Sequence, residues 1–395
     1  MAVTGLGVVS CLGCEPASFW SSLAQGLDGM APLNDFPGLR FKTGCRVRDF
    51  LPEQHFSARQ LEQLDPITQY FVVAGRQASA GLVVRQPGRA GLVHGTGGGA
   101  QVGLGQSYLR VHRGERLGPG VIPKVMHNAP VSFLAQELGW CGPSYTLSTA
   151  CASSNHALGQ AFWMIRAGLL DVALAGGSEA PFSEGYLRAW EAIRAVAPDR
   201  CRPFSKNRSG MTLAEGAGVL LLENFDHARA RGATVYAEML GFGMSSDAHD
   251  LTRPLQSGAV QAMSAALQDA GLQPQQIDYI NAHGTGTLAN DSTETAAIRQ
   301  VFGGHAERLL VSSTKSSHGH ALGAAGGLEA VASVLALRHQ LAPATLGYQE
   351  PDPECDLDYV VNQPRPAELT RAMSNSFAFG GLNAVVIFSR EPACE

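Results

Sequence analysis

Cys151 is the side chain whose surroundings most clearly suggest chemistry. It stands in STACASSNHALG (148–159), where an expected strand over 145–150 passes into an expected helix. A thiol at the N-terminus of a helix faces the positive end of the helix dipole and unpaired N–H groups, and both favour the thiolate. A buried structural cysteine, the usual state of a free cysteine, is an equally good interpretation of this segment alone.

Histidines follow two expected strands in the second half of the chain. His283 ends one of these strands in NAHGTGT, and STKSSHGHALGAAGG (313–327) places Lys315, His318 and His320 before a glycine-rich helix entry. A reactive cysteine together with loop histidines is the set that acyl transfer through a thioester requires. The sequence therefore suggests a cleft in which a thiol and imidazoles meet.

Two other interpretations of the histidines compete with this one. His283, His318 and His320 could bind zinc, but the ammonium of Lys315 beside them would oppose a dication. We therefore expect no metal. His283 could equally be an imidazole of the core whose hydrogen bonds are satisfied.

Two glycine-rich segments have no such chemistry of their own. HGTGGG (94–99) is not followed by the Gly-Lys-Ser/Thr of a phosphate-binding loop, so we expect a turn that lets backbone approach a pocket. NSFAFGGLN (375–383) joins Phe377 and Phe379 to Gly380-Gly381. It could form a mobile lid, or core packing followed by a turn.

Strands that alternate with helices would position these residues. We expect strands over 2–9, 89–93, 145–150, 172–175, 219–222, 278–282, 309–313, 359–361 and 385–388. We expect helices over 16–24, from Asp65-Pro66 through 73, over 130–138 and over 258–270, one opened by a capping-box-like Asp291–Glu294, and one carrying Leu328, Val331 and Leu335.

One stretch of sequence recurs. Ser148-Thr149, Ser153-Ser154 and His156-Ala-Leu-Gly159 return as Ser313-Thr314, Ser316-Ser317 and His320-Ala-Leu-Gly323, with one residue fewer before the histidine. The letters are common enough for a chance match. Because both copies follow an expected strand and precede an expected helix, they suggest two halves descended from one β/α unit.

Composition excludes several classes of protein. The chain has 395 residues, a net charge of −5 and a pI of about 6.2, which argues against global disorder and against a basic nucleic-acid binder. No run approaches the roughly 20 apolar residues of a membrane helix, and the start lacks the features of a signal peptide. Eight scattered cysteines indicate reduced thiols, so we expect a cytoplasmic protein.

The motifs together resemble those of the elongating β-ketoacyl-ACP synthases, the ketosynthase II type of the thiolase-like condensing enzymes. STAC at Cys151, NAHGTGT at His283, STKSxxGH from Lys315 to His320, GAAG with Glu329, and NSFxFGG occur in that family's order over essentially the whole chain. The resemblance implies an α/β thiolase-like fold with duplicated βαβαβ halves in five α-β-α-β-α layers. We place the halves at 1–235, with the nucleophile, and 236–395, with the histidine pair.

The resemblance also implies a reaction. The enzyme would be an acyltransferase that condenses malonyl-ACP, with loss of CO₂, onto an acyl chain bound to its cysteine, in fatty-acid or polyene and polyketide elongation. Its substrates arrive on the phosphopantetheine of acyl carrier protein (ACP), so no separate cofactor is expected. It would be a homodimer or, alternatively, the ketosynthase of a heterodimer with a chain-length factor in aryl-polyene or nodulation-factor biosynthesis. A non-catalytic acyl-ACP scaffold fits an intact Cys-His-His set poorly.

Roles for single residues follow from the same resemblance. Cys151 would carry the acyl group, with the backbone N–H groups of Cys151 and Phe379 holding its oxyanion. Neutral His283 and His320 would donate N–H to the enolate formed as CO₂ leaves, and Lys315, supported by Glu329, would set the electrostatics. Thr285 and Thr287 would bind phosphopantetheine, and Phe379 would gate the acyl pocket. The other substrate-binding residues that we expect are Gly98, Trp190, Thr252 and Gly380.

Departures from the family pattern concern the acyl pocket and the docking surface. Gly98 replaces a bulky aliphatic residue at the pocket floor, which predicts a deeper or wider pocket. The aromatic-rich helix after Cys151, with Trp190 downstream, looks closer to the nodulation-factor and aryl-polyene ketosynthases. The ACP-docking region keeps Arg59 but loses neighbouring basic residues, so we expect docking to rely on Arg59 together with Arg113, Arg116 and Arg202.

Overall fold

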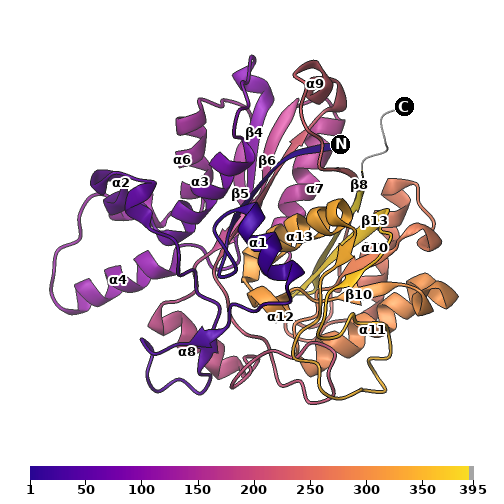
Figure 1. Cartoon of the computed structure of the whole chain (residues 1–395). Coiled ribbons are helices and arrows are strands. Elements are labelled where there is room, and N and C mark those ends of the chain that lie inside the picture. The colour runs from indigo at the N-terminus through magenta and orange to yellow at the C-terminus, as the bar shows by residue number, and fades with distance from the viewer. Residues whose placement is uncertain (391–395) are drawn as a thin grey trace.

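The N-terminal half forms five adjacent strands in the computed structural model, which describes residues 1–390 (Figure 1). These strands are β1 (Ala2–Val9), β4 (Ala90–Gly95), β5 (Ser144–Leu147), β6 (Val172–Glu179) and β7 (Gly216–Glu223). Their order across the sheet is β5-β4-β6-β7-β1. β4 runs parallel to β5 and β6, whereas β7 is antiparallel to β6 and β1.

The C-terminal half repeats this topology. Its strands are β8 (Ala237–Ser246), β9 (Tyr279–Asn281), β10 (Leu310–Ser312), β13 (Arg371–Ala378) and β14 (Leu382–Ser389). They are ordered β10-β9-β13-β14-β8, with parallel and antiparallel pairs at the same places as in the first half. Numbered within its own half, each set reads 3-2-4-5-1. The duplicated thiolase-like fold predicted from the sequence is confirmed.

The halves are joined between β1 and β8. Ala2 pairs with Glu238 and Val3 with Ala237, so the strands form one continuous ten-stranded sheet rather than two separate ones. The predicted boundary near residue 235 falls in the connection between α9 (Phe225–Ala230) and β8. It stays a prediction.

Two central helices lie between the halves. α7 (Ser153–Arg166) packs on β4 and β6 of the first half and on β8 and β14 of the second, and α13 (Ala325–His339) packs likewise on β7 and β13. Every residue of α13 from Ala325 to Leu337 is buried, and all of them except Glu329 and Ser333 are apolar or glycine. The two halves of the sheet therefore cover opposite faces of the central helix layer.

Outer helices complete the five layers. α3 (Pro66–Ala78) and α6 (Ala129–Leu138) cover the first half, and α10 (Gln256–Ala270) and α11 (Leu288–Phe302) cover the second. The remaining helices are α1 (Pro16–Ala24), α2 (Ala58–Gln63), α4 (Gln101–His112), α5 (Val121–Val125), α8 (Glu184–Ile193) and α12 (Lys315–His318). The short strands are β2 (Ala31–Pro32), β3 (Thr43–Gly44), β11 (Leu341–Ala342) and β12 (Arg365–Pro366). No helix within residues 1–390 is long and apolar enough to cross a membrane.

Two expected elements were wrong. α11 begins at Leu288 because its N-cap is Thr287, four residues before the predicted cap Asp291. The Thr287 hydroxyl accepts a hydrogen bond from the Asn290 N–H. Asp291 instead accepts the backbone N–H groups of Phe204 and Gly286 from inside the first turn. The expected strand over 359–361 is an irregular segment with a single bridge to Thr345.

Candidate active site

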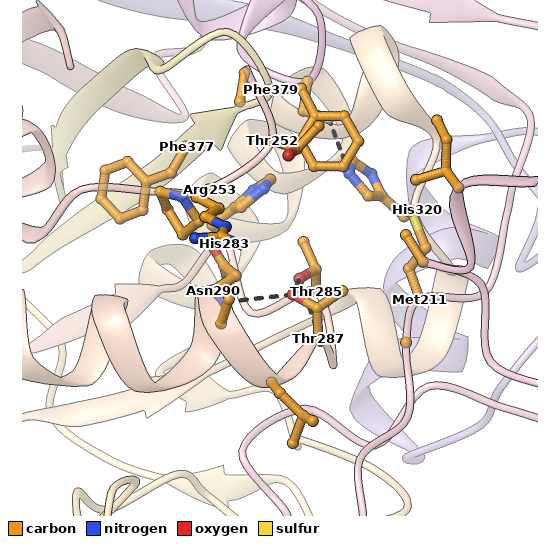
Figure 2. A pocket seen from close by; sticks show the side chains of 18 of the residues that line it. Met211, Thr252, Arg253, His283, Thr285, Thr287, Asn290, His320, Phe377 and Phe379 are labelled. Carbon is orange, nitrogen blue, oxygen red and sulfur yellow. Dashed lines mark hydrogen bonds between the residues drawn. The ribbon is translucent and has the colours of Figure 1, made fainter. Parts of the chain in front are cut away.

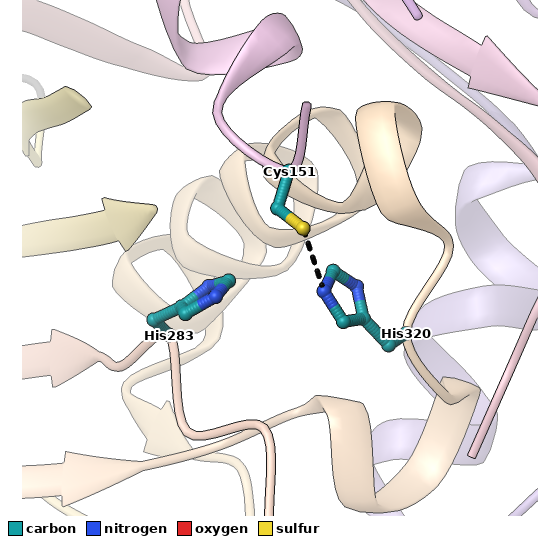
Figure 3. A group of neighbouring side chains, drawn as sticks. All are labelled: Cys151, His283 and His320. Carbon is teal, nitrogen blue, oxygen red and sulfur yellow. Dashed lines mark hydrogen bonds between the residues drawn. The ribbon is translucent and has the colours of Figure 1, made fainter. Parts of the chain in front are cut away.

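Cys151, His283, His320 and Phe379 meet where strands of both halves end. Cys151 lies in the turn between β5 and α7, His283 follows β9, His320 follows β10 and α12, and Phe379 follows β13. Cys151 is only 6% exposed, and the two histidines 2% or less. Each half thus supplies part of one buried cluster (Figure 3).

The proton on His320 can be placed from its hydrogen bonds. Nδ1 of His320 accepts the backbone N–H of Leu322 at 3.2 Å, so the ring proton of the neutral imidazole must be on Nε2. Nε2 lies 3.2 Å from Sγ of Cys151 and points its N–H at the sulfur (Figure 3). The His283 ring stands nearly perpendicular to that of His320, with centroids 5.4 Å apart. A donor therefore faces the thiol, with a second imidazole beside it.

Burial keeps both imidazoles neutral. It lowers the pKa of His283 and of His320 well below the ordinary 6.5, and the ammonium of Lys315 adds to the effect. The cationic forms would lose their hydration inside the protein. Both rings are therefore hydrogen-bond donors without charge at neutral pH.

Burial is also the largest influence on the pKa of Cys151. It raises the pKa of this thiol from 9.0 to about 12, although Lys315 and the backbone N–H of Phe379 act in the opposite direction. We expected the helix N-terminus to favour the thiolate. In the resting site the loss of hydration outweighs that help, and the cysteine is a thiol.

Lys315 forms a buried ion pair with Glu329. The ammonium reaches Oε1 of Glu329, and both side chains are at most 1% exposed. Burial raises the pKa of Glu329, and Lys315 counters that rise. The pairing agrees with the support expected from Glu329, and it leaves a compact positive group close to both histidines and the thiol.

His318 lies outside the cluster. Its Nδ1 faces the carbonyl of Gly319 at 2.8 Å and its Nε2 faces the hydroxyl of Thr314 at 3.0 Å. Burial lowers its pKa to about 3. The group whose donor atoms converge within 4.8 Å consists of Cys151, His283 and His320, so the alternative zinc site that included His318 does not form.

A cavity of about 340 Å³ leads to this cluster (Figure 2). Thr285 and Thr287 line it, with their hydroxyls 2.9 Å apart, and Thr252 lines it from the loop after β8. Gly380 does not line it. The N–H of Gly380 donates to the carbonyl of Leu251 at 2.7 Å, which ties the Phe379 turn to the loop carrying Thr252.

A second cavity of about 250 Å³ begins on the other side of Phe379. Cys151 and Phe379 border both cavities. Trp190 lines the second one and stacks on Phe379, with ring centroids 6.1 Å apart and planes inclined by 24°. The extra room that we expected beside Gly98 is occupied by the Tyr186 phenol, and Gly98 lines neither cavity.

The candidate docking arginines are dispersed. Arg59 lies on α2 and Arg113 and Arg116 follow α4, all exposed, while Arg202 is bound to Asp199 and its side chain is only 14% exposed. Sequence reasoning missed two cations at the entrance of the larger cavity.

Those two cations are Arg194 and Arg253. Both are exposed, and neither has an ion-pair partner within residues 1–390. A signal was present for Arg253, which directly follows Thr252, a residue that we expected to bind substrate. Arg194 follows the C-terminal end of α8 with a left-handed backbone, and nothing in its local sequence points to the cavity.

Known proteins resemble the chain over its full length. Residues 1–228 match the family model described as the N-terminal domain of beta-ketoacyl synthase, and residues 236–349 match its C-terminal domain. Nodulation protein E of Rhizobium sp. is 44% identical, with 98% of each chain covered. The 3-oxoacyl-[acyl-carrier-protein] synthase 2 of Synechocystis sp. is 39% identical and covers 99% of this chain and 98% of its own.

Solved structures agree. The ishigamide ketosynthase/chain length factor superposes with a TM-score of 0.94 at 36% identity, covering 99% of both chains. A ketosynthase (ApeO) in complex with its chain length factor (ApeC) from Xenorhabdus doucetiae gives 0.85 at 30% identity, covering 99% of this chain and 98% of that chain.

Proposed function

The chain belongs to the beta-ketoacyl synthase family, and we propose that Cys151, His283 and His320 perform its condensation. As a family member the chain is a condensing acyltransferase that uses substrates carried on ACP. The observation that carries the assignment of residues is the proton position on His320. Nε2 of His320 lies 3.2 Å from Sγ of Cys151, and the hydrogen bond from the Leu322 N–H to Nδ1 keeps the ring proton on Nε2. The Nε2–H can therefore donate to negative charge on the sulfur or on a substrate atom next to it.

The first half-reaction loads the acyl chain. The minor thiolate form of Cys151, stabilised by the Nε2–H of His320 and the positive charge of Lys315, attacks the thioester of acyl-ACP. The oxyanion of the tetrahedral intermediate accepts hydrogen bonds from the backbone N–H groups of Cys151 and Phe379. The carbon–sulfur bond to phosphopantetheine then breaks, and the acyl group remains on Cys151. Phosphopantetheine leaves on ACP as a thiolate and takes up a proton, which replaces the one that Cys151 lost.

The second half-reaction forms the new carbon–carbon bond. The bond between the malonyl methylene and its carboxylate breaks, CO₂ leaves, and the electron pair becomes an enolate whose oxygen accepts N–H from His283 and His320. Neutral imidazoles suit this role because they donate without protonating the carbanion. The carbanion attacks the acyl carbonyl on Cys151, the bond to Sγ breaks, and β-ketoacyl-ACP departs while the thiolate regains a proton.

The substrates would enter through the larger cavity. Thr285 and Thr287 offer hydroxyls to the phosphopantetheine arm, and the unpaired Arg194 and Arg253 at the entrance would attract its phosphate and the acidic ACP. No separate cofactor is needed for these steps. We place the protein in the cytoplasm, and the seven cysteines within residues 1–390, all unpaired, support this.

A second subunit is the remaining partner. β5 is an edge strand whose four residues are all half-buried, and α4 and α5 expose apolar side chains that include Tyr108 at 71% and Ile122 at 68%. Such a surface suits a permanent interface. A homodimer or a heterodimer with a chain-length factor would cover it, as in the neighbours named as ketosynthase with chain length factor.

Intact mass spectrometry tests the assignment of the nucleophile. After incubation with acyl-ACP, the wild type should gain one acyl group, and Cys151→Ala none. Cys141→Ser, which removes an exposed thiol, is the matched control and should behave as wild type. An adduct that persists in Cys151→Ala, or wild-type protein that never forms one, would contradict the proposal.

A further inference from the structure

Gly98 is a glycine for reasons of space. Its backbone φ is not positive, so the backbone conformation would allow a residue with a side chain. A Cβ atom at this position would instead lie 2.7 Å from the hydroxyl oxygen of Tyr186 and 3.0 Å from its Cζ. The phenol occupies the volume that a side chain at position 98 would need.

Tyr186 enters this space from α8. Tyr186 and Trp190 are one helical turn apart, so both project from the same face of the helix toward the smaller cavity. Their rings meet edge to face, with centroids 6.1 Å apart and planes at 89°. Because Trp190 also stacks on Phe379, one row of aromatic rings runs from Cys151 to the phenol.

The buried carboxylate of Glu179 fixes the position beyond the phenol. Its oxygens accept the backbone N–H groups of Gly97 at 2.7 Å, Gly98 at 2.9 Å and Gly323 at 2.9 Å. Oε1 of Glu179 lies 3.1 Å from the same Cβ position that the Tyr186 hydroxyl approaches. A carboxylate held by three backbone donors does not move aside, so the phenol has little room to retreat when an acyl chain presses against it.

We propose that Tyr186 sets the greatest length of acyl group that Cys151 accepts, in the place of a side chain at position 98. This rests on the proposed function, because it assumes that the smaller cavity holds the acyl chain. The cavity of about 250 Å³ exceeds the roughly 150 Å³ that holds a benzene molecule in an engineered protein core. It therefore takes a short chain or one ring before the phenol stops it.

A double-mutant cycle tests the exchange between the two positions. The variants are Tyr186→Phe, Tyr186→Ala, Gly98→Ala and the double variant Gly98→Ala/Tyr186→Ala. The control is Val83→Ala, an exposed apolar side chain that lines neither cavity. The readout is the rate at which Cys151 gains mass from ACPs carrying saturated acyl chains from butyryl to palmitoyl.

The single substitutions Tyr186→Ala and Gly98→Ala should change the accepted acyl length in opposite directions. Tyr186→Ala should extend the accepted length, with about a fourfold gain for each further methylene that the enlarged cavity buries. Tyr186→Phe and Val83→Ala should match the wild type. Gly98→Ala should shorten the accepted length because its methyl group displaces the phenol, and Tyr186→Ala should remove that effect in the double variant.

Two outcomes overturn the proposal separately from the proposed function. Acyl-Cys151 that forms normally, but with the same chain-length profile in Tyr186→Ala as in wild type, refutes the role of Tyr186 alone. A Gly98→Ala effect that persists undiminished in the double variant refutes the exchange of positions. If no acyl group ever appears on Cys151 of the wild type, the proposed function fails and the role of Tyr186 fails with it.

Discussion

The resting thiol of Cys151 should react slowly with alkylating agents, and the structure allows the rate to be worked out. Burial raises its pKa from 9.0 to about 12. At pH 8 this lowers the thiolate fraction by about 1000-fold relative to an unperturbed cysteine. A more basic thiolate is the better nucleophile, and with a Brønsted slope of about 0.45 each thiolate reacts about 20-fold faster, which offsets part of this loss. We therefore expect alkylation about 50-fold slower than that of an ordinary thiol.

The assay is a timed reaction with iodoacetamide between pH 6.5 and 9.5, followed by peptide mass spectrometry. Exposed Cys141 serves as the reference thiol within the same molecule. The logarithm of the Cys151 rate should rise with unit slope across the whole range, without a plateau. Lys315→Met should slow Cys151 further, because Lys315 is the strongest influence that lowers this pKa, and should leave Cys141 unchanged.

One result would refute the reasoning. If Cys151 reacts before Cys141 at pH 7 and its rate no longer rises above that pH, the thiolate is already formed. The helix N-terminus and Lys315 would then outweigh burial, contrary to the balance inferred from the structure. A Lys315→Met variant that reacts as fast as wild type would contradict the part assigned to the ammonium.

Three further predictions concern titration and the loop after β9. The pH profile of kcat/KM between pH 5.5 and 8 should show no imidazole inflection, because the pKa values of His283 and His320 lie well below 6.5; an inflection near 6.5 would contradict this. Thr287→Ala should lower the free energy of unfolding by about 1 kcal/mol through loss of the α11 cap and raise KM for malonyl-ACP, whereas Thr287→Ser should retain the cap; denaturant titration and steady-state kinetics measure both. Burial raises the pKa of Glu179, Glu215 and Glu294 from 4.5 to about 7, so the folded state binds more protons than the unfolded state between these pH values. The contribution of these three carboxyl groups to stability therefore falls as pH rises from about 4.5 to about 7, while the buried neutral histidines act in the opposite direction below about 6.5. The Tm of Glu215→Gln minus that of wild type should therefore increase over this window, and a difference that does not change with pH would refute the assignment.

The sequence was informative where function depends on residues close together in the chain. STAC, NAHGTGT and STKSSHGH each place the side chain that we propose to be reactive in the segment that follows a strand, and the segments after parallel strands gather at one edge of a sheet. The repeated segment also pointed correctly to two related halves, since its copies directly follow the equivalent strands β5 and β10, the first running into α7 and the second ending just before α13.

What the sequence could not predict depends on contacts between distant segments. The space at Gly98 is decided by Tyr186, 88 positions further along the chain, so a missing side chain did not mean an open pocket. The protonation of Cys151 is decided by burial under residues from both halves, which no local pattern around a helix N-terminus reports. Asp291 was taken for a cap because its spacing to Glu294 fits one, yet it faces inward and accepts backbone N–H groups from two other segments.

The clearest case is a pair of histidines in the same four-residue sequence. HGTG occurs at His94, in β4, and at His283, after β9, and these are equivalent second strands of the two halves. His94 has hydroxyl partners on both nitrogens, Thr146 at 3.2 Å and Ser178 at 2.8 Å, and burial lowers its pKa to about 3.

His283 is as deeply buried, but its Nδ1 has no hydrogen-bond partner within the described chain, and its ring borders the larger cavity. The same letters therefore give a satisfied core imidazole in one half and, in the other, the imidazole that we propose to be reactive. The difference lies in whether neighbouring strands supply hydroxyl partners to the ring. A ring that borders a cavity without hydroxyl partners is the property by which we propose that His283, and not His94, is available to a substrate.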